Sequence, residues 1–420
     1  MFALVDCKNF YVSVERLFQP ALRGRPVVVL SSNDGCVVSR SDEAKSLGIK
    51  MSQPFFQLRD LVRSHGLVMC SSNFALYADL SQRVATVLRE MAPRCEQYSV
   101  DECFLALDGV MGDLDALGRE IRRRVLKEVG IPVGVGIAPT KTLSKLASFA
   151  SKKWPKTEGV VDLRDPARQR RLLSLPVMTV DEVWGIGRRH TERLNAMGIT
   201  HAIQLAEFDR KTLRRLFNVN VERTARELAG ERCFDLEDSP VPKQMIACTR
   251  SFGERVYELA LLEQAVATYG CRASEKLRGQ HQLCRMVQVF VSTGTFTEGD
   301  ARYSRSASVP MPYPSADSRD IVEAAQAGLR AIYVSGPAYA KAGVILMDFV
   351  GDGHFTDDLF APAPRPNSHR VMSVMDEINR RQGRNTLRLA RTLSDTGWSM
   401  KRERMSKRFT TSWSELPIAY

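Results

Sequence analysis

The stretch 98–107, YSVDECFLAL, places two adjacent acids, Asp101 and Glu102, inside a run that otherwise has the pattern of a buried strand. A buried carboxylate carries a large desolvation cost unless it binds a cation. A third acid, Asp6, ends the apolar stretch 2–6, FALVD. On neighbouring strands of one sheet, these three acids form a cluster of oxygen ligands of the kind that binds Mg²⁺.

Adjacent residues on a regular strand face opposite sides of the sheet, so Asp101 and Glu102 share a metal only at a bend or bulge, which we expect there. The alternative is a pair of edge-strand acids in water. The dipeptide Asp-Glu also occurs at 42–43, 181–182 and 376–377, where polar or helical surroundings favour a solvated surface.

Short strands and amphipathic helices mix in the first 165 residues. Strands are predicted at 2–6, 26–30, 96–107 and 131–137, and the segment NFYVSVERLF predicts a helix with Asn9 as its N-cap. Residues 166–236 are dense in helical patterns, 236–243 form a proline-containing linker, and 245–350 alternate strands with two helices. The class is therefore α+β or α/β, in several domains.

Length and charge agree with several domains and a polyanionic partner. A chain of 420 residues exceeds the size of one ordinary core. The net charge of +12 is uneven: zero over 1–110, +6 over 111–240, −1 over 241–360 and +7 over 361–420. This distribution suits a protein that binds nucleic acid and keeps its acids for chemistry, although a generally basic protein is the simpler alternative.

Several classes are disfavoured. No apolar run approaches the roughly 20 residues of a membrane helix, and the start, MFALVDCKNF, has no signal-peptide pattern, so we expect a cytoplasmic protein that contacts no membrane. The nine cysteines are odd in number and form no CxxC pair, which argues against a disulfide framework and a zinc site.

Basic residues follow two of the predicted core segments. Lys141 and Lys145 lie on a helix that begins after GVGIAPT, and Arg40 and Lys45 lie in SRSDEAKSLG. Such groups are suited to hold a triphosphate whose oxygens also bind metal ions, although single lysines on helices more often face solvent.

The segment 183–187, VWGIG, predicts a helix-hairpin-helix turn. Its glycines, Gly185 and Gly187, allow backbone N–H groups at a helix N-terminus to meet a DNA phosphate, and Arg188 and Arg189 add charge. The same triplet GIG occurs in ordinary helix connections, so this signal is only moderately specific.

Taken together, FALVDCKNFYVSVE, NDGCVVSRSDEAKSLGIKM, YSVDECF, GVGIAPTKTLSKLA and VWGIG resemble the Y-family translesion DNA polymerases, most closely the UmuC-type catalytic subunits of bacterial DNA polymerase V. The resemblance runs along practically the whole chain. It implies an α+β right-hand fold: a palm at 1–12 and 75–165, fingers at 13–74, a thumb with the helix-hairpin-helix at 166–236, a little finger at 244–352 and a C-terminal partner-binding region at 353–420.

The resemblance also assigns roles to residues. It implies that Asp6, Asp101 and Glu102 are the catalytic acids of two-metal nucleotidyl transfer with two Mg²⁺ ions, and that Cys7 contributes a backbone carbonyl. Tyr11 resembles the steric gate beneath the sugar of the incoming nucleotide, with Phe10 beside it; a core aromatic is the alternative for Tyr11. The residues similar to nucleotide-contacting positions are Lys45 and Lys145, with Arg40 near the first.

Two positions depart from the family pattern. Asp42 stands where many members carry a tyrosine, three residues before Lys45, which weakens the expected grip on phosphate. The clamp-binding peptide of UmuC relatives is similar to Gln-x-x-Leu-Phe, whereas this chain has Thr356-Asp357-Asp358-Leu359-Phe360. Without the glutamine, binding to a sliding clamp is an open question.

The function that these features predict is error-prone, template-directed DNA synthesis across lesions, with primer-template DNA and deoxynucleoside triphosphates as substrates. By resemblance, the expected partners are a UmuD′-type dimer and a RecA-type recombinase filament. The alternative is a non-catalytic DNA-binding subunit of a repair complex. In the tail, basic residues alternate with Trp398, Phe409 and Trp413, which suits either single-stranded DNA or a protein partner; the resemblance favours the partner.

Overall fold

The computed structural model describes residues 1–237, 242–294, 302–353, 362, 364–392 and 398–416. The chain divides into two compact units. The first comprises Met1–Ser31, Gly35–Pro240 and Arg404–Tyr420, and the second comprises Ser32–Asp34 and Val241–Glu403. The C-terminal region predicted as one segment at 353–420 is therefore shared between both units.

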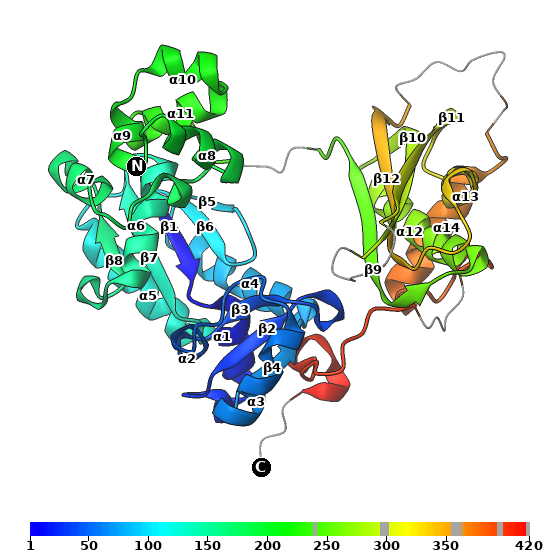
Figure 1. Ribbon diagram of the computed structural model, residues 1–420, viewed down its shortest axis with the longest axis horizontal. Coiled ribbons are helices and arrows are strands. Elements are labelled where there is room, and N and C mark those ends of the chain that lie inside the picture. The colour runs from blue at the N-terminus through cyan, green and yellow to red at the C-terminus, as the bar shows by residue number, and fades with distance from the viewer. Residues whose placement is uncertain (238–241, 295–301, 354–361, 363, 393–397, 417–420) are drawn as a thin grey trace. The chain divides into compact units, whose positions relative to one another are not determined.

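A five-stranded sheet forms the centre of the first unit (Figure 1). Its order is β5-β6-β1-β7-β8, with β1 antiparallel to both β6 and β7 and with β7 parallel to β8. All six residues of β1 are buried, which explains its continuous apolar sequence. The strands are β1 (Phe2–Cys7), β5 (Arg94–Gln97), β6 (Glu102–Ala106), β7 (Val133–Ala138) and β8 (Val160–Asp162).

Helices pack against this sheet on both faces. The odd-numbered residues of β1, including Ala3 and Val5, share a core with α4 (Phe74–Arg89) and α5 (Leu114–Val129). The even-numbered residues point to the opposite face, because side chains alternate along a strand. Helix α6 (Lys141–Lys153) packs against β1 and β7 and joins a separate core with the helices that follow it.

A smaller three-stranded sheet, of order β3-β2-β4, lies in the same unit. Strand β2 runs parallel to β4 and antiparallel to β3, so β4 is an edge strand. The elements here are α1 (Phe10–Phe18), η1 (Pro20–Leu22), β2 (Val27–Leu30), η2 (Ser32–Asp34), β3 (Val37–Arg40), α2 (Asp42–Ser46), η3 (Phe55–Leu58), α3 (Arg59–His65) and β4 (Val68–Ser71).

A helical part follows β8 and shares one apolar core with α6. This part agrees with the helical pattern predicted for 166–236. Its elements, with the short η4 before β8, are η4 (Pro155–Thr157), α7 (Pro166–Leu173), η5 (Val180–Glu182), α8 (Arg188–Ala196), α9 (Ala202–Glu207), α10 (Arg210–Leu216) and α11 (Val219–Leu228).

The second unit is a two-layer α+β domain with an antiparallel sheet of order β11-β10-β12-β9. Helices α12 and α13 pack together and share the core with the sheet, and α14 is joined to α12 by an ion pair between Arg278 and Asp376 at 2.6 Å. The elements are β9 (Ile246–Val256), α12 (Leu259–Arg278), β10 (Gln282–Thr293), β11 (Ser304–Ser315), α13 (Ser318–Ile332), β12 (Tyr339–Gly351) and α14 (Ser368–Gln382).

The final segment of the chain returns to the first unit, where Figure 1 draws it in red beside β4. Met405 forms a parallel bridge with Ser71 of β4, and Phe409 is buried in the core that also contains β1. Two short 3₁₀ helices, η6 (Phe409–Thr411) and η7 (Trp413–Glu415), end the described chain.

Three tail aromatics were predicted to face DNA or a partner, but two of them are used internally. Trp398 packs edge-on against Phe252 and Tyr269 of the second unit, with ring centroids 6.1 and 5.9 Å apart. Phe409 stacks on Phe18 at 4.5 Å. Trp413 remains 92% exposed. The prediction was wrong for Trp398 and Phe409, because these rings complete apolar cores.

Two further expectations need correction. The single strand predicted at 96–107 is two strands, β5 and β6, joined by a tight bend at 98–101. Asn9 precedes α1 but makes no side-chain cap; its φ of 49° is left-handed and its side chain donates to Asp42 instead.

All nine cysteines are free thiols. Across the described residues no helix has the length and apolar character needed to cross a membrane.

Candidate functional site

The predicted acids meet at one end of the five-stranded sheet. Asp6 lies opposite Glu102 in the antiparallel register of β1 and β6. Asp101 occupies the bend before β6, where its carbonyl accepts a 2.8 Å hydrogen bond from the Cys7 N–H and its Oδ1 accepts a 2.6 Å bond from Ser99 Oγ. The expected bend is present, so two successive acids no longer need to face opposite sides of a strand.

Charge is costly at this place. Burial raises the pKa of Asp6 to about 6, and the nearby charges of Glu102 and Asp101 add to that effect while Lys152 opposes it. Burial, with Asp6 and Asp101 nearby, also raises the pKa of the Cys7 thiol. A cation placed beside the buried Asp6 carboxylate would favour its charged form.

The positive charges at the acids come from α6. Lys145 Nζ donates to Glu102 Oε2 at 2.8 Å, and Lys152 Nζ contacts Asp6 Oδ2. Within the described parts of the chain, no three His, Cys, Asp or Glu side chains are grouped closely enough to hold a metal ion. Each acid has its own donor: Ser99 for Asp101, Lys145 for Glu102 and Lys152 for Asp6. The metal set of Asp6, Cys7, Asp101 and Glu102 stays a prediction.

Lys152 is the residue at this site that the motif analysis missed. It lies seven residues after Lys145, or about two helical turns, which places both on one face of α6. That spacing could have identified Lys152. However, Lys153 and Lys156 lie close by, so the group resembles an ordinary basic helix end.

Two glycines of β7 allow α6 to reach the acids. Gly134 is paired with Asp6, and a Cβ on it would lie 2.8 Å from Lys152 Cγ and 2.6 Å from Ser151 Oγ. At Gly136 a Cβ would lie 2.2 Å from the backbone nitrogen of Ser148. These residues therefore serve close helix-to-sheet packing, which explains why they form no phosphate loop.

Lys141, at the other end of α6, makes a structural pair. Its ammonium donates to Glu96 of β5, and the two side chains are only 4% and 9% exposed. The ammonium also lies 4.8 Å above the ring of Phe104. Lys141 and Lys145 do share one face of α6, since both ammonium groups lie over the Phe104 ring. The predicted phosphate contact of Lys141 is wrong, because its side chain is buried against Glu96.

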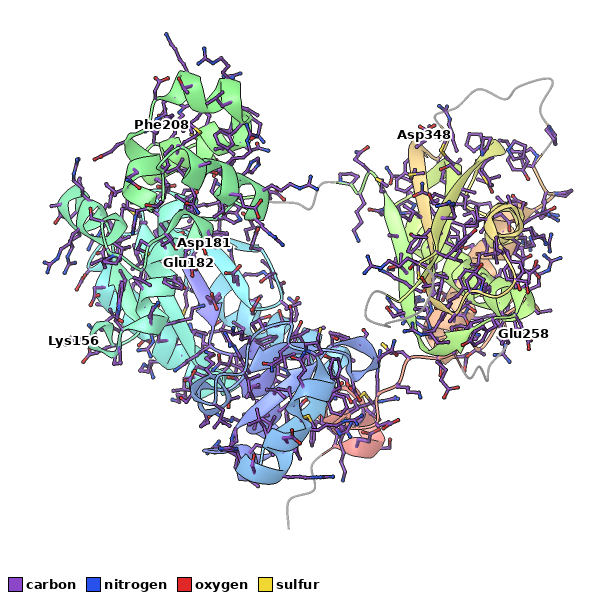
Figure 2. The ribbon with its side chains drawn as sticks, viewed as in Figure 1. Lys156, Asp181, Glu182, Phe208, Glu258 and Asp348 are labelled. Atoms are coloured by element: carbon purple, nitrogen blue, oxygen red, sulfur yellow. The ribbon has the colours of Figure 1, made fainter. Side chains whose placement is uncertain are left out.

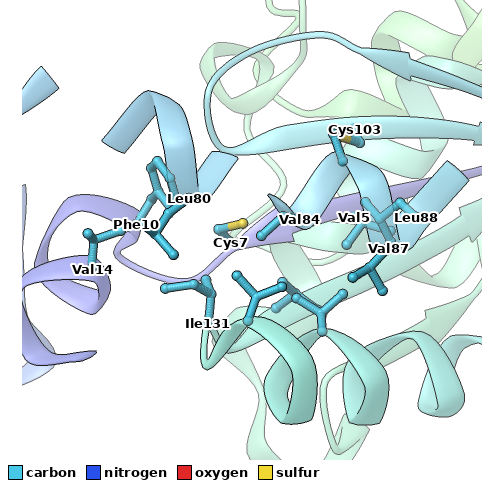
Figure 3. Packing of buried hydrophobic residues seen from close by; sticks show 14 of the residues in the cluster. Val5, Cys7, Phe10, Val14, Leu80, Val84, Val87, Leu88, Cys103 and Ile131 are labelled. Atoms are coloured by element: carbon cyan, nitrogen blue, oxygen red, sulfur yellow. The ribbon is translucent and has the colours of Figure 1, made fainter. Parts of the chain in front are cut away.

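The two aromatic candidates differ in exposure. Phe10 is 3% exposed and points into the core with Val14 and Leu80 (Figure 3). This side chain is enclosed, so the expected substrate contact of Phe10 stays a prediction that its backbone alone could fulfil. Tyr11 is half-buried and its ring stacks on Tyr77 at 4.4 Å. Burial and the charge of Asp101 raise the pKa of Tyr11, which places this phenol near the acid cluster.

A compact charge network surrounds Asp42. Lys8 Nζ lies 2.7 Å from Asp42 Oδ2, and Lys45 Nζ lies 3.0 Å from Oδ1 and 2.7 Å from Asn9 Oδ1. Partial burial opposes ionisation of Asp42, but the bonds from Lys8, Asn9 and Lys45 hold its pKa well below its ordinary range. Asp42 therefore competes directly for Lys45. Arg40 bonds the Ile49 carbonyl, a structural contact.

The turn of the predicted hairpin lies directly before α8. Gly187 is the N-cap of α8, and Gly185 has a φ of +87° that favours glycine. Arg188 and Arg189 are both exposed, the former paired with Glu192 at 2.9 Å. The arm before the turn is only the 3₁₀ helix η5, where Asp181 and Glu182 are exposed as expected for a solvated pair (Figure 2).

Comparison with known proteins places the chain in a family. The impB/mucB/samB family matches residues 5–149, its C-terminal domain matches 243–359, and a domain of unknown function (DUF4113) matches 369–419. Protein UmuC of Salmonella typhimurium is 50% identical over 99% of both chains, and protein MucB of Escherichia coli is 44% identical over 100% of this chain and 99% of its own.

The chain belongs to the impB/mucB/samB family. Among solved structures, a Y-family DNA polymerase chimera of Dbh and Dpo4 matches 84% of this family member and 100% of its own chain, with a TM-score of 0.67 and 21% identity. The fold of this impB/mucB/samB protein is therefore that of the Y-family DNA polymerases. DNA polymerase IV 1 of Bacillus subtilis is 33% identical over 59% of this chain and 58% of its own length.

Proposed function

We propose that this protein is a DNA-directed DNA polymerase that extends primers across damaged template bases. The observation that carries the proposal is the meeting of Asp6, Asp101 and Glu102 at one end of the five-stranded sheet, within a Y-family fold and in a chain similar over its whole length to UmuC. Membership in a family related to DNA polymerase IV supports the reaction class.

The donor chemistry of the site fits magnesium. Carboxylate oxygens of Asp6, Asp101 and Glu102 and the carbonyl of Cys7 are hard ligands, and the raised pKa of Asp6 reflects a need for positive charge. These residues would hold two Mg²⁺ ions, which supply Lewis-acid activation of the primer 3′-hydroxyl and charge neutralisation at the leaving pyrophosphate.

The residues of the chain have the remaining tasks. Lys152 and Lys145 hold the acids in the free enzyme, and release from those carboxylates makes their ammonium groups available to phosphate oxygens. Lys45, with Lys8, presents further positive charge beside Asp42. Tyr11 lies against Tyr77, where it excludes a 2′-hydroxyl and so selects deoxynucleotides.

The parts of the fold receive the roles of a right-hand polymerase. The five-stranded sheet is the palm, the three-stranded sheet the fingers, α7–α11 the thumb and the four-stranded sheet with its helices the little finger. Gly185, Gly187, Arg188 and Arg189 contact the DNA backbone without reading sequence. The peptide Thr356-Asp357-Asp358-Leu359-Phe360, considered for clamp binding, lies outside the described residues.

The partners carried over from the resemblance are a UmuD′-type dimer and a RecA-type filament. Within the described tail, the exposed surface of α14 and the exposed Trp413 are available to them, whereas Trp398 and Phe409 are used internally. Because the tail contributes to both units, a chain ending after Asp352 is expected to lose core contacts of the first unit as well as partner binding.

Primer extension tests the proposal. With Mg²⁺ and deoxynucleotides the wild type should extend a primer past a template lesion, and Asp101→Asn should lose at least about a thousandfold in kcat, roughly 4 kcal/mol, because a ligand charge is removed. Asp60→Asn, at an exposed position of α3, is the matched control and should keep wild-type activity. Normal extension by Asp101→Asn would remove Asp101 from the catalytic acids, whereas a wild type that binds primer-template DNA and extends no primer would favour a non-catalytic DNA-binding subunit.

A further inference from the structure

The last described segment of the chain packs against β4, α4 and α1, close to Tyr11. Arg404 and Ser71 exchange two hydrogen bonds, one from the Ser71 N–H to the Arg404 carbonyl at 3.0 Å and one from the Arg404 N–H to Ser71 Oγ at 3.0 Å. With the parallel bridge between Ser71 and Met405, this pairing adds the segment to the edge of β4.

Asn73, the N-cap of α4, holds the next residues. Its side-chain amide donates to the Ser406 carbonyl at 3.3 Å, to Ser406 Oγ at 3.1 Å and to the Lys407 carbonyl at 3.1 Å, and Asn73 is 2% exposed. Further along, Thr410 Oγ1 donates to Asp79 Oδ2 of α4 at 2.7 Å. Together with Phe409 on Phe18, these contacts fix the segment to both α1 and α4.

Ser406 reaches a buried carboxylate. Glu15 of α1 is fully buried, and its Oε1 accepts hydrogen bonds from Tyr77 Oη at 2.7 Å and from Ser406 Oγ at 3.1 Å. Its other oxygen accepts from Gln19 at 3.1 Å. The Tyr77 ring in turn stacks on Tyr11 with an interplanar angle of 15°. The chain of contacts therefore runs from Ser406 through Glu15 and Tyr77 to Tyr11.

We propose that the C-terminal segment 404–411 supports the sugar-selecting residue Tyr11. In this support, Ser406, Glu15 and Tyr77 are positioning residues that fix the orientation of the Tyr11 ring. The inference rests on the proposed role of Tyr11. Without the Ser406 hydroxyl, Glu15 Oε1 keeps a single donor, Tyr77, and the buried carboxylate is held by fewer hydrogen bonds. The Glu15 carboxylate, which accepts the Tyr77 hydroxyl bond, is then less firmly fixed. The Tyr77 ring, and the Tyr11 ring stacked on it, are therefore held less firmly.

The test measures sugar discrimination in the full chain, as the ratio of kcat/KM for a deoxynucleotide to that for the matching ribonucleotide. Because both values come from one preparation, a loss of folded enzyme cancels. Ser406→Ala should lower the ratio about threefold to tenfold, the expected effect of one ordinary hydrogen bond. Ser406→Thr keeps the hydroxyl and should retain the ratio, and Ser414→Ala, exposed in the same tail, is the matched control.

Three outcomes are decisive. An unchanged ratio in Ser406→Ala beside a collapsed ratio in Tyr11→Ala overturns the inference and leaves the proposed gate intact. An unchanged ratio in Tyr11→Ala overturns the gate itself and the inference with it. Tyr77→Phe, which keeps the stacked ring, should give the same loss as Ser406→Ala, and the double variant should lose no more than either; additive losses contradict a shared path through Glu15.

Discussion

The two ends of α6 carry the same kind of contact, a lysine on a carboxylate of the sheet, in two different settings. Lys141 and Glu96 are 4% and 9% exposed, and Glu96 also accepts the Glu237 N–H at 2.9 Å. Lys152 and Asp6 are 29% and 12% exposed, and two more acids lie near Asp6. A buried pair whose carboxylate has a second donor stabilises the fold, whereas a more exposed pair among further acids is typical of a site that exchanges its cation.

The largest effect should follow from breaking the buried pair. Lys141→Met leaves the Glu96 carboxylate buried without its cation, which should lower the free energy of unfolding by about 3–5 kcal/mol. Urea denaturation measures this loss. The double variant Lys141→Met/Glu96→Gln removes both charges and keeps an acceptor for the Glu237 N–H, so it should recover much of the stability. If Lys141→Met is as stable as wild type, the Lys141–Glu96 pair does not stabilise the fold and resembles the Lys152–Asp6 pair instead.

An intermediate effect is expected at the more exposed pair. Lys152→Met should lower kcat/KM for the incoming nucleotide about tenfold to hundredfold, or roughly 1.4–2.7 kcal/mol. The free energy of unfolding should change by less than about 1 kcal/mol, because a partly exposed pair contributes little. Lys156→Met, exposed beyond the helix end, is the control and should match wild type in both measurements. A large stability loss with normal kinetics would remove the distinction between the two ends of α6.

The smallest effect concerns pH. The pKa of Asp6 is raised to about 6, so its ionised, cation-binding form is depleted as the pH falls below that value. Without metal, its contribution to stability is present below the unfolded pKa of 3.8 and is lost as the pH rises through about 6. Added Mg²⁺ should therefore raise Tm by a few degrees more near about pH 7.5 than near about pH 5.5. Asp6→Asn should abolish the difference; an equal shift at both pH values would locate metal binding elsewhere.

The acid cluster was predictable from sequence because its signals are local. Two apolar strands each carry an acid that burial penalises, and pairing of those strands then brings Asp6 to Glu102. The bend at Asp101 followed from the alternation of side chains along a strand. The Y-family fold and the family itself were confirmed, since the motifs occur in order along the chain.

What sequence could not separate were residues whose role depends on distant partners. Lys141, Lys145 and Lys152 look alike on one helix, and only the sheet beneath them decides which is enclosed and which reaches an acid. Phe409 is an aromatic in a basic tail, and its partner Phe18 lies near the other end of the chain. The composition of such a basic segment predicts an exposed position. The apolar core that contacts it is formed by residues far away in the sequence.

The burial of Phe409 sets an order of events during synthesis. A ribosome releases the N-terminal parts of a chain first, and domains generally fold as they emerge. Here the core that holds β1 and α1 includes the ring of Phe409, and β4 gains its edge partner from Met405. The first unit therefore completes its packing only after residues 405–409 have been synthesised, so chains that stop before them carry an unfinished core.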